Sequence, residues 1–226
     1  MKTAVIIQAR MDSSRLPGKV MMKLDGKNTT LYYVITQLQS CKLVNQIIVA
    51  TSDLKQDDII AEFSKNMGIS VFRGNEKNVL DRFYQCAKIF YTDIIIRIPA
   101  DKPLIDPNLV DDAIQKFQEN NVDYLSNWLE ESIPGGTEIE IFSFNTLKKI
   151  WKKSITDYQK EHVTPYIYEN KGEFKIVNLK YKKFSHNLKY SLDTKQDYDV
   201  IKKIISLIEQ RPILTKDIHR ILNQYF

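Results

Sequence analysis

Three cationic side chains gather in one short segment near the start of the chain. The stretch ARMDSSRLPGK, residues 9–19, contains Arg10, Arg15 and Lys19 together with two serines and one glycine. Guanidinium groups bind phosphate oxygens in a fork, an ammonium group supplies a movable point charge, and small residues let backbone N–H groups approach a ligand. The segment is therefore a candidate cradle for a polyphosphate, although a solvated basic turn explains the same spacing equally well. Its single glycine distinguishes it from a Walker loop and from the GxGxxG fingerprint.

Two aspartates are further candidates for phosphoryl chemistry. Asp101 directly follows an apolar run and is flanked by Pro99 and Pro103, which fix the turn. A carboxylate at the carboxyl end of a strand, facing a triphosphate, is well placed to hold Mg²⁺, which prefers oxygen ligands and retains several waters. Asp193, in the stretch LDTKQD, is by its position alone better explained as the N-cap of the helix that follows.

The elements that must position these residues alternate along the first half of the chain. Short apolar runs predict buried strands, and apolar residues at helical spacing predict the helices between them. The predicted strands are 4–7, 47–50, 70–72, 93–98 and 122–126. The predicted helices are 29–40, 78–90 and 108–119. A further helix is predicted after SDLKQDD, with Ile59, Ile60 and Phe63 on its apolar face. This rhythm indicates parallel strands joined by right-handed crossovers. Ligands of such sheets bind beyond the carboxyl ends of the strands, so the loops at 8–19, 51–53, 73–81 and 99–106 are the ones to inspect.

The pattern changes after residue 126. Alternating residues in TEIEIFSF, 137–144, predict an antiparallel or edge strand. The remaining predicted elements are helices at 145–153, 158–169, 196–209 and 215–224 and strands at 174–179 and 188–192. We therefore expect an α/β fold with three α/β/α layers, a mostly parallel twisted sheet and a small antiparallel extension, in a single domain over residues 1–226.

Composition excludes several classes of protein. Of the 226 residues, 43% are hydrophobic and 27% are charged, as in an ordinary globular protein, and no apolar run approaches the ~20 residues of a membrane helix. The net charge of +5, from 33 basic and 28 acidic residues, favours anionic partners only weakly, and no basic arm or patch indicates nucleic acid. Cys41 and Cys86 lack metal-ligand spacing, which indicates reduced thiols and a cytoplasmic location.

The segment IIQARMDSSRLPGKV, residues 6–20, resembles the N-terminal signature of the cytidylyltransferases that activate sugar acids with CTP. This family includes the acylneuraminate and 3-deoxy-manno-octulosonate enzymes, and the branch it resembles most is named after spore coat polysaccharide biosynthesis protein F. Further similar segments follow in order: VATSD at 49–53, VFRGNEKNVLDRFYQCA at 71–87, PADKPLIDP at 99–107, EIEIFSF at 138–144, EHVTPYIY at 161–168 and LDTKQDYDVI at 192–201. The resemblance implies a Rossmann-like nucleotide-diphospho-sugar transferase fold.

The resemblance also implies roles for individual residues on the nucleotide side. It places Arg15, Lys19, Asp101 and Asp193 in the catalytic machinery, with Mg²⁺ held by the two aspartates and the cations on the triphosphate of CTP. The nucleotide itself is expected to contact Gln8, Ala9, Arg10, Ser14, Asp53 and Arg82. Two of these have simpler alternatives, a helix N-cap for Asp53 and a surface pair with Asp81 for Arg82.

On the acceptor side, the resemblance implies that residues 127–190 supply sugar contacts and part of a homodimer interface. The implied substrate-binding residues are Glu138, Glu140, Glu161, His162 and Thr164. His162 can equally cap its own helix. Three positions depart from the family pattern, namely Asp12, Lys102 and Glu138, and these departures bear on which sugar is bound.

The function implied by the resemblance is transfer of CMP from CTP to a nonulosonic or octulosonic sugar acid, with release of pyrophosphate, for surface polysaccharide synthesis. One alternative is a sugar-1-phosphate nucleotidyltransferase or a glycosyltransferase of similar fold. A glycosyltransferase would require a DxD metal motif, and the segment Ala100-Asp101-Lys102 contains only one of the two acidic residues of that motif. Another alternative is a non-catalytic nucleotide-binding subunit, which would be favoured by loss of a metal carboxylate, but both aspartates are present.

Overall fold

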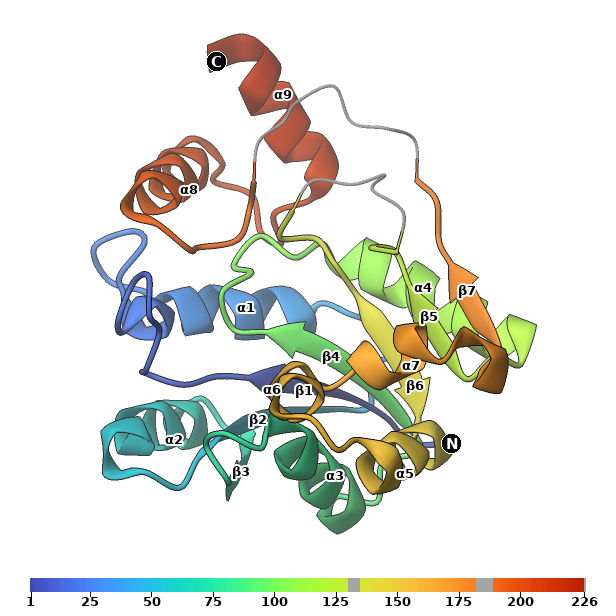
Figure 1. The fold of residues 1–226 in the computed structure, drawn as a ribbon. Helices are drawn as coiled ribbons and strands as arrows, with labels where there is room; N and C mark the ends of the chain where they lie inside the picture. Colours follow the sequence, from blue (N-terminus) through green and yellow to red (C-terminus); the bar gives the residue numbers. More distant parts are fainter. Residues whose placement is uncertain (130–134, 182–188, 226) are drawn as a thin grey trace.

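A seven-stranded sheet forms the centre of the computed structural model, which describes residues 1–129, 135–181 and 189–225 (Figure 1). The order of its strands is β3-β2-β1-β4-β6-β5-β7. The strands are β1 (Thr3–Gln8), β2 (Gln46–Ser52), β3 (Ser70–Gly74), β4 (Ile94–Pro99), β5 (Tyr124–Ser126), β6 (Glu140–Ser143) and β7 (Ile176–Asn178). The apolar runs of the sequence become strands because both faces of the sheet are covered by helices.

The strand pairing brings the predicted loops to one edge of the sheet. β1 runs parallel to β2 and β4, and in this register Gln8 lies opposite both Ala50 and Pro99. β6 runs antiparallel to β4 and β5, so its first residue, Glu140, lies opposite Arg97 near that same edge. The predicted antiparallel strand is confirmed, but it lies inside the sheet between β4 and β5 and is not an edge strand.

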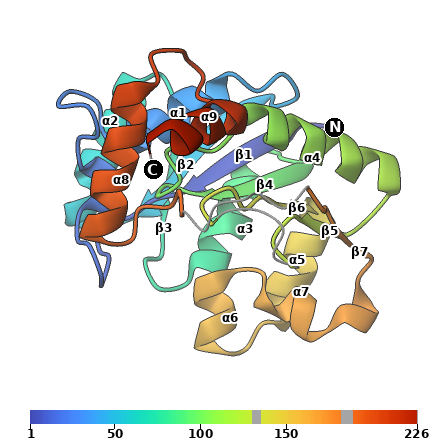
Figure 2. The same cartoon turned by 90° about the horizontal axis from the view of Figure 1, so that it is seen from above.

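Helices cover the sheet on both faces, which confirms the three-layer arrangement. They are α1 (Thr30–Gln39), α2 (Asp58–Asn66), α3 (Val79–Ile89), α4 (Pro107–Asn120), α5 (Phe144–Lys153), α6 (Asp157–His162), α7 (Pro165–Glu169), α8 (Lys195–Leu207) and α9 (Thr215–Tyr225), with 3-10 turns η1 (Lys19–Met21), η2 (Lys55–Asp57) and η3 (Lys171–Glu173). One core contains residues of α1, α2 and α4, and the core on the other face contains residues of α3, α5 and α7. Figure 2 shows α8 and α9 on the side of α1, with α6 and α7 on the opposite side.

Three predictions about local structure were wrong. The helix predicted for 158–169 is two helices, because Val163 has a φ of 72° and Pro165 begins α7. Residues 189–192 of the predicted strand 188–192 are not in a strand, and residue 188 lies outside the described part of the chain. Ile59 was predicted to lie on the apolar face of its helix, but it is 48% exposed, and its neighbour Ile60 packs into the core.

No helix in the described part of the chain is both long and apolar enough to cross a membrane.

Candidate active site

The loop between β1 and η1, residues 9–18, is held by hydrogen bonds within itself and to the end of β2. The Gly18 amide donates to the Met11 carbonyl at 2.9 Å, which closes residues 11–18 of the loop, and Gly18 has the positive φ of 71° that this turn requires. The Met11 amide donates to the buried Asp57 carboxylate at 2.7 Å, and the Ser52 hydroxyl donates to the same carboxylate. Asp57 therefore ties the loop to the end of β2.

The structure brings together the four residues predicted as catalytic. The Lys19 ammonium lies 2.5 Å from Asp101 Oδ2 and 2.9 Å from Asp193 Oδ1, although these aspartates are 92 positions apart in the chain. Arg15 donates to Asp193 Oδ1 at 2.8 Å, and Lys189 pairs with the other oxygen of that carboxylate. The Lys19 side chain is 12% exposed and that of Arg15 is 64% exposed, so Arg15 is free to swing toward a ligand while Lys19 lies deep in the cluster.

Asp193 is not the N-cap that its position suggested. Thr194 caps α8 and forms a capping box with Asp197. Burial would raise the pKa of Asp193, but hydrogen bonds from Lys189 and Lys19 outweigh burial and lower the pKa from 3.8 to about 2. The carboxylate is therefore ionised at neutral pH.

The backbone before Asp193 is held against two other loops. The Leu192 amide donates to the Asp101 carbonyl at 2.8 Å, and the Tyr190 amide donates to the Gly135 carbonyl at 2.5 Å. Gly136, with a φ of 99°, lies so close that an added Cβ would stand 2.3 Å from the Ser191 nitrogen. These contacts set the distance between Asp193 and Asp101.

Two of the three departures from the family pattern are partners of one another. The Lys102 ammonium lies 2.7 Å from Glu138 Oε2 and donates to the Glu138 carbonyl at 2.9 Å. The same carboxylate accepts the Gly136 amide at 2.8 Å. Glu138 therefore neutralises the charge of Lys102 beside Asp101, and the ion pair joins the loop that contains Asp101 to the turn at Gly136. The third departure, Asp12, is exposed.

Arg82 is the most informative of the predicted nucleotide residues. It is fully buried, which excludes the surface pair with Asp81, and its Nη1 donates to the carbonyls of Asn75 and Glu76 at 2.7 and 3.2 Å. Its Nε and Nη2 atoms are buried and have no hydrogen-bond partner among the described residues. Burial and the neighbouring Arg10 lower the pKa of Arg82 to about 10. A buried cation with unpaired donors facing a second cation is suited to an anionic or carbonyl-rich ligand.

The other predicted nucleotide residues lie around the same edge. Gln8 accepts a hydrogen bond from Arg97 at 3.2 Å, and the amide of the buried Ala9 donates to the Ala50 carbonyl at 3.2 Å. Ser14 and Asp53 are exposed. Asp53 is not a helix cap, because Leu54 holds the N-cap position of η2.

The predicted acceptor residues divide into a buried and an exposed group. Glu140 is paired with Arg97 and accepts hydrogen bonds from the Tyr124 and Thr164 hydroxyls, each at 2.6 Å. Burial alone would raise the pKa of Glu140, but Arg97 and the two hydroxyls outweigh it, so the pKa falls below its ordinary value. This network joins β4, β5 and β6 to the start of α7.

The exposed group, Glu161 and His162, lies beside the loop of residues 9–18. Glu161 forms an ion pair with Arg10 at 3.2 Å, which brings the acceptor segment into contact with the cationic loop. His162 is exposed and lies against the Tyr158 ring, with 4.5 Å between ring centroids. The C-cap of α6 is Val163, so His162 does not hold that position.

Sequence reasoning missed Arg97, Asp57 and Lys189. Asp57 lies within SDLKQDD, where three aspartates compete for one role and only the fold identifies the buried one. Arg97 is a charged residue inside an otherwise apolar strand, DIIIRI, and that mismatch was a usable signal. Lys189 has no local signal, because its role depends on where the chain before Asp193 lies.

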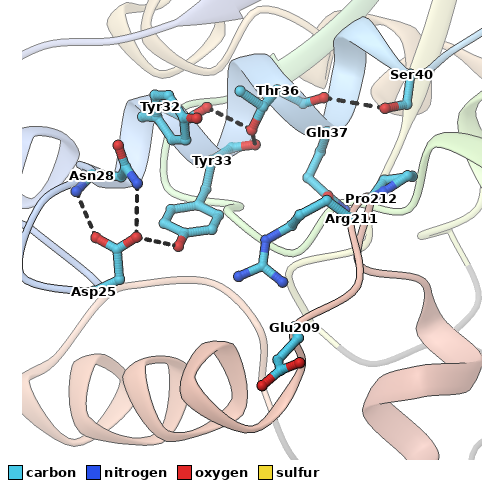
Figure 3. Close-up of a pocket in the computed structure, with 10 residues that line it drawn as sticks. All are labelled: Asp25, Asn28, Tyr32, Tyr33, Thr36, Gln37, Ser40, Glu209, Arg211 and Pro212. Carbon is cyan, nitrogen blue, oxygen red and sulfur yellow. Dashed lines mark hydrogen bonds between the residues drawn. The ribbon is translucent and has the colours of Figure 1, made fainter.

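A separate pocket of about 370 Å³ lies on the outer side of α1 (Figure 3). It is lined by Asp25, Asn28, Tyr32, Tyr33, Thr36, Gln37, Ser40, Glu209, Arg211 and Pro212, none of which belongs to the predicted site. The Tyr33 hydroxyl donates to Asp25 at 2.7 Å, and the Arg211 guanidinium lies 5.6 Å from the Tyr33 ring centroid. Because Asp25 is bonded to Tyr33 and Arg211 to the carbonyls of Ile208 and Gln210, we interpret the pocket as a packing seam between α1 and residues 209–212.

Replacing Gln37 with Leu is expected to lower the free energy of unfolding by about 3 kcal/mol, because buried backbone groups would lose their partners. The Gln37 amide nitrogen donates to the carbonyls of Ile105 and Ile213 at 2.9 and 2.6 Å, and its oxygen accepts the Ile213 amide at 2.8 Å. Urea unfolding measures the change. Gln39→Leu is the matched control, since Gln39 is exposed on the same helix and should alter stability by less than about 0.5 kcal/mol. Equal effects of the two changes would contradict the proposed role of Gln37.

Known proteins are similar to this chain in fold and in sequence. A solved cytidylyltransferase from Leptospira borgpetersenii has a TM-score of 0.95 and 31% identity, covering 99% of this chain and 94% of that one. An uncharacterized protein of Methanocaldococcus jannaschii is 39% identical over 99% of this chain and 90% of its own length. The spore coat polysaccharide biosynthesis protein SpsF of Bacillus subtilis is 34% identical over 92% of this chain and 88% of its own length.

The fold and these relatives define a nucleotidyltransferase enzyme. The family model described as Cytidylyltransferase matches residues 4–221, and the chain belongs to this family.

Proposed function

We propose that the protein transfers CMP from CTP to a hydroxyl group of a sugar acid and releases pyrophosphate, in the synthesis of a surface polysaccharide. The observation that carries this proposal is the cluster of Arg15, Lys19, Asp101 and Asp193 at the ligand-binding edge of the sheet. Similarity to the spore coat polysaccharide biosynthesis protein supports the pathway class. The sugar acid is supported by the resemblance of the first loop to the acylneuraminate and octulosonate enzymes.

In this reaction the acceptor oxygen forms a bond to the α-phosphorus of CTP, and the bond from that phosphorus to the β-phosphate oxygen breaks. The hydroxyl proton passes to solvent, and the leaving group is pyrophosphate. Such transfers depend mainly on positioning and on neutralising charge. Arg15 and Lys19 would bind the β- and γ-phosphates and stabilise the leaving group. Arg82 would contact the nucleotide beyond its phosphates once the residues that cover its unpaired donors move aside.

The residues fit the magnesium ion that the family implies. Because Lys19 bonds to both Asp101 and Asp193, the two carboxylates lie within reach of one shared cation. Over residues 1–129, 135–181 and 189–225, no three metal-ligating side chains lie together as a cage. Mg²⁺ does not require one, since it is typically held by one or two carboxylates, substrate phosphates and waters. When bound, it would neutralise charge on the α-phosphate.

The acceptor would bind beside the loop of residues 9–18, in the region bordered by Glu161 and His162. The ion pair between Arg10 and Glu161 supports this placement, because it joins the acceptor segment to the cationic loop. The inner side of that region would be formed by Glu138, Glu140 and Thr164. A single domain over residues 1–226, with a dimer interface in 127–190, is part of the same proposal, and sedimentation of the purified chain tests the dimer.

Among the four ribonucleoside triphosphates with Mg²⁺, CTP is expected to raise the melting temperature most. A pyrophosphate-release assay with CTP across nonulosonic and octulosonic acids then identifies the acceptor. Preference for UTP or GTP would contradict the proposal, as would release of pyrophosphate with sugar-1-phosphates only.

Arg15→Ala tests the phosphate contact within the same experiment. We expect it to weaken CTP binding by about tenfold or more, since a charge-assisted hydrogen bond contributes about 1.5–3 kcal/mol. Arg220→Ala is the matched control, because Arg220 is 68% exposed and likewise pairs with an aspartate, Asp217 at 3.6 Å. Unchanged affinity in Arg15→Ala would count against the cradle.

A further inference from the structure

The Lys19 ammonium lies where a shared metal ion would have to bind. Its Nζ atom is 2.5 Å from Asp101 and 2.9 Å from Asp193, so it already bridges the two carboxylates. With side chains 20% and 9% exposed, these carboxylates would repel each other strongly without a cation between them. Lys19 therefore occupies the place between the two carboxylates that a shared divalent cation would take.

The charges of the cluster oppose a metal that arrives without nucleotide. Arg15, Lys19 and Lys189 contribute three positive charges and the two aspartates contribute two negative ones, so the net charge is 3 − 2 = +1. A divalent cation would have to displace the ammonium from both carboxylates and remain close to it. A triphosphate reverses this balance, because it brings several negative charges to which lysine and arginine bind readily.

Lys19 is able to make this exchange without a change of fold. Its backbone is fixed at the start of η1, where its amide donates to the Leu16 carbonyl at 3.2 Å. The ammonium stands at the end of a flexible four-carbon stem and can move while the backbone stays in place. The nearby Arg15 side chain is exposed and pairs only with Asp193 among the described residues.

We propose that Lys19 is an internal counter-cation that keeps divalent metal out of the Asp101–Asp193 site until a nucleotide draws its ammonium away. The inference rests on the proposed role of these two aspartates as metal ligands. It assigns Lys19 two successive partners, the carboxylates before nucleotide binding and the phosphates after it. The order of binding then follows from the charges, with the metal entering together with or after the nucleotide.

Binding of Mn²⁺ to the nucleotide-free protein, followed by electron paramagnetic resonance of the free ion, tests this proposal. Wild type should bind Mn²⁺ weakly, and Lys19→Met should bind it at least about tenfold more tightly, because a positive charge within contact distance of the site is removed. Lys23→Met is the matched control. Lys23 is exposed, four residues beyond Lys19, in an isolated β-bridge with Thr29. Its replacement removes the same charge, so the Mn²⁺ affinity of this variant should stay within about twofold of wild type.

The double variant Lys19→Met/Asp101→Asn should lose the gained affinity, which would place the ion at these carboxylates. Lys19→Gln is a second neutral variant in case Lys19→Met does not fold, and the same tightening is expected. Equal Mn²⁺ affinity in wild type and a folded Lys19 variant would overturn the proposal, as would a gain that survives Asp101→Asn. Since no nucleotide is present, these results do not depend on CTP preference, and failure of the proposed function would show separately in the nucleotide screen.

Discussion

Asp101→Asn is expected to lower the rate of pyrophosphate release from CTP by about a thousandfold while leaving the melting temperature near that of wild type. The size of the effect follows from the loss of a charged group at the reacting phosphate, where a single preorganised contact contributes about 10²–10³ in rate. Stability should change little, because asparagine has the same size and keeps an oxygen that can accept from Lys19. Single-turnover measurement at saturating CTP separates the chemical step from nucleotide binding.

Asp199→Asn serves as the control for this prediction. Asp199 is 64% exposed, pairs with Lys195 at 3.4 Å on α8 and loses the same charge a few residues from Asp193. It should release pyrophosphate within about twofold of wild type, as expected for a surface ion pair. A large fall in melting temperature for Asp101→Asn would show that the carboxylate supports the fold instead of the reaction.

The strands of the N-terminal half and their parallel pairing were predictable, because parallel strands covered on both faces require continuous apolar residues. Their order in the sheet came only from the structure. Runs such as AVII at 4–7 and IIVA at 47–50 meet the requirement for continuous apolar residues. A short run of this kind is typical of a strand that is buried on both faces of a sheet. The placement of the loops at one edge then followed from the parallel topology. This is why Lys19 and Asp101, 82 positions apart, could be assigned to one site without coordinates.

Partners within the site were not predictable in the same way, because they depend on contacts between distant segments. Lys102 and Glu138 each looked like an isolated departure, and only the fold shows that they neutralise each other. Arg82 was expected either at the nucleotide or in a surface pair with Asp81, and only tertiary packing shows that it is completely buried. The break between α6 and α7 is local, but its cause at Val163 is a backbone conformation that helical periodicity does not reveal.

Gly136→Ala is expected to lower the free energy of unfolding by about 3 kcal/mol and the rate of pyrophosphate release by about a hundredfold. A Cβ at this position would lie 2.3 Å from both the Ser191 nitrogen and the Tyr190 carbonyl carbon, which are backbone atoms that cannot rotate away. The chain leading to Asp193 would have to move, and with it the carboxylate that Lys19 and Arg15 hold. Urea unfolding and pyrophosphate release measured on the same preparation show both effects.

Gly26→Ala separates the clash from backbone strain. Gly26 has a similar positive φ of 82°, but nothing lies within 4 Å of an added Cβ. This variant should lose only about 1 kcal/mol from the left-handed backbone and keep its activity. If Gly136→Ala were no worse than Gly26→Ala in both measurements, the close approach of Gly136 to residues 190–191 would not be what positions Asp193. If activity falls only in Gly136→Ala, and falls further when Lys102→Met is added, the ion pair of Lys102 and Glu138 helps to position Asp193 through the Gly136 turn.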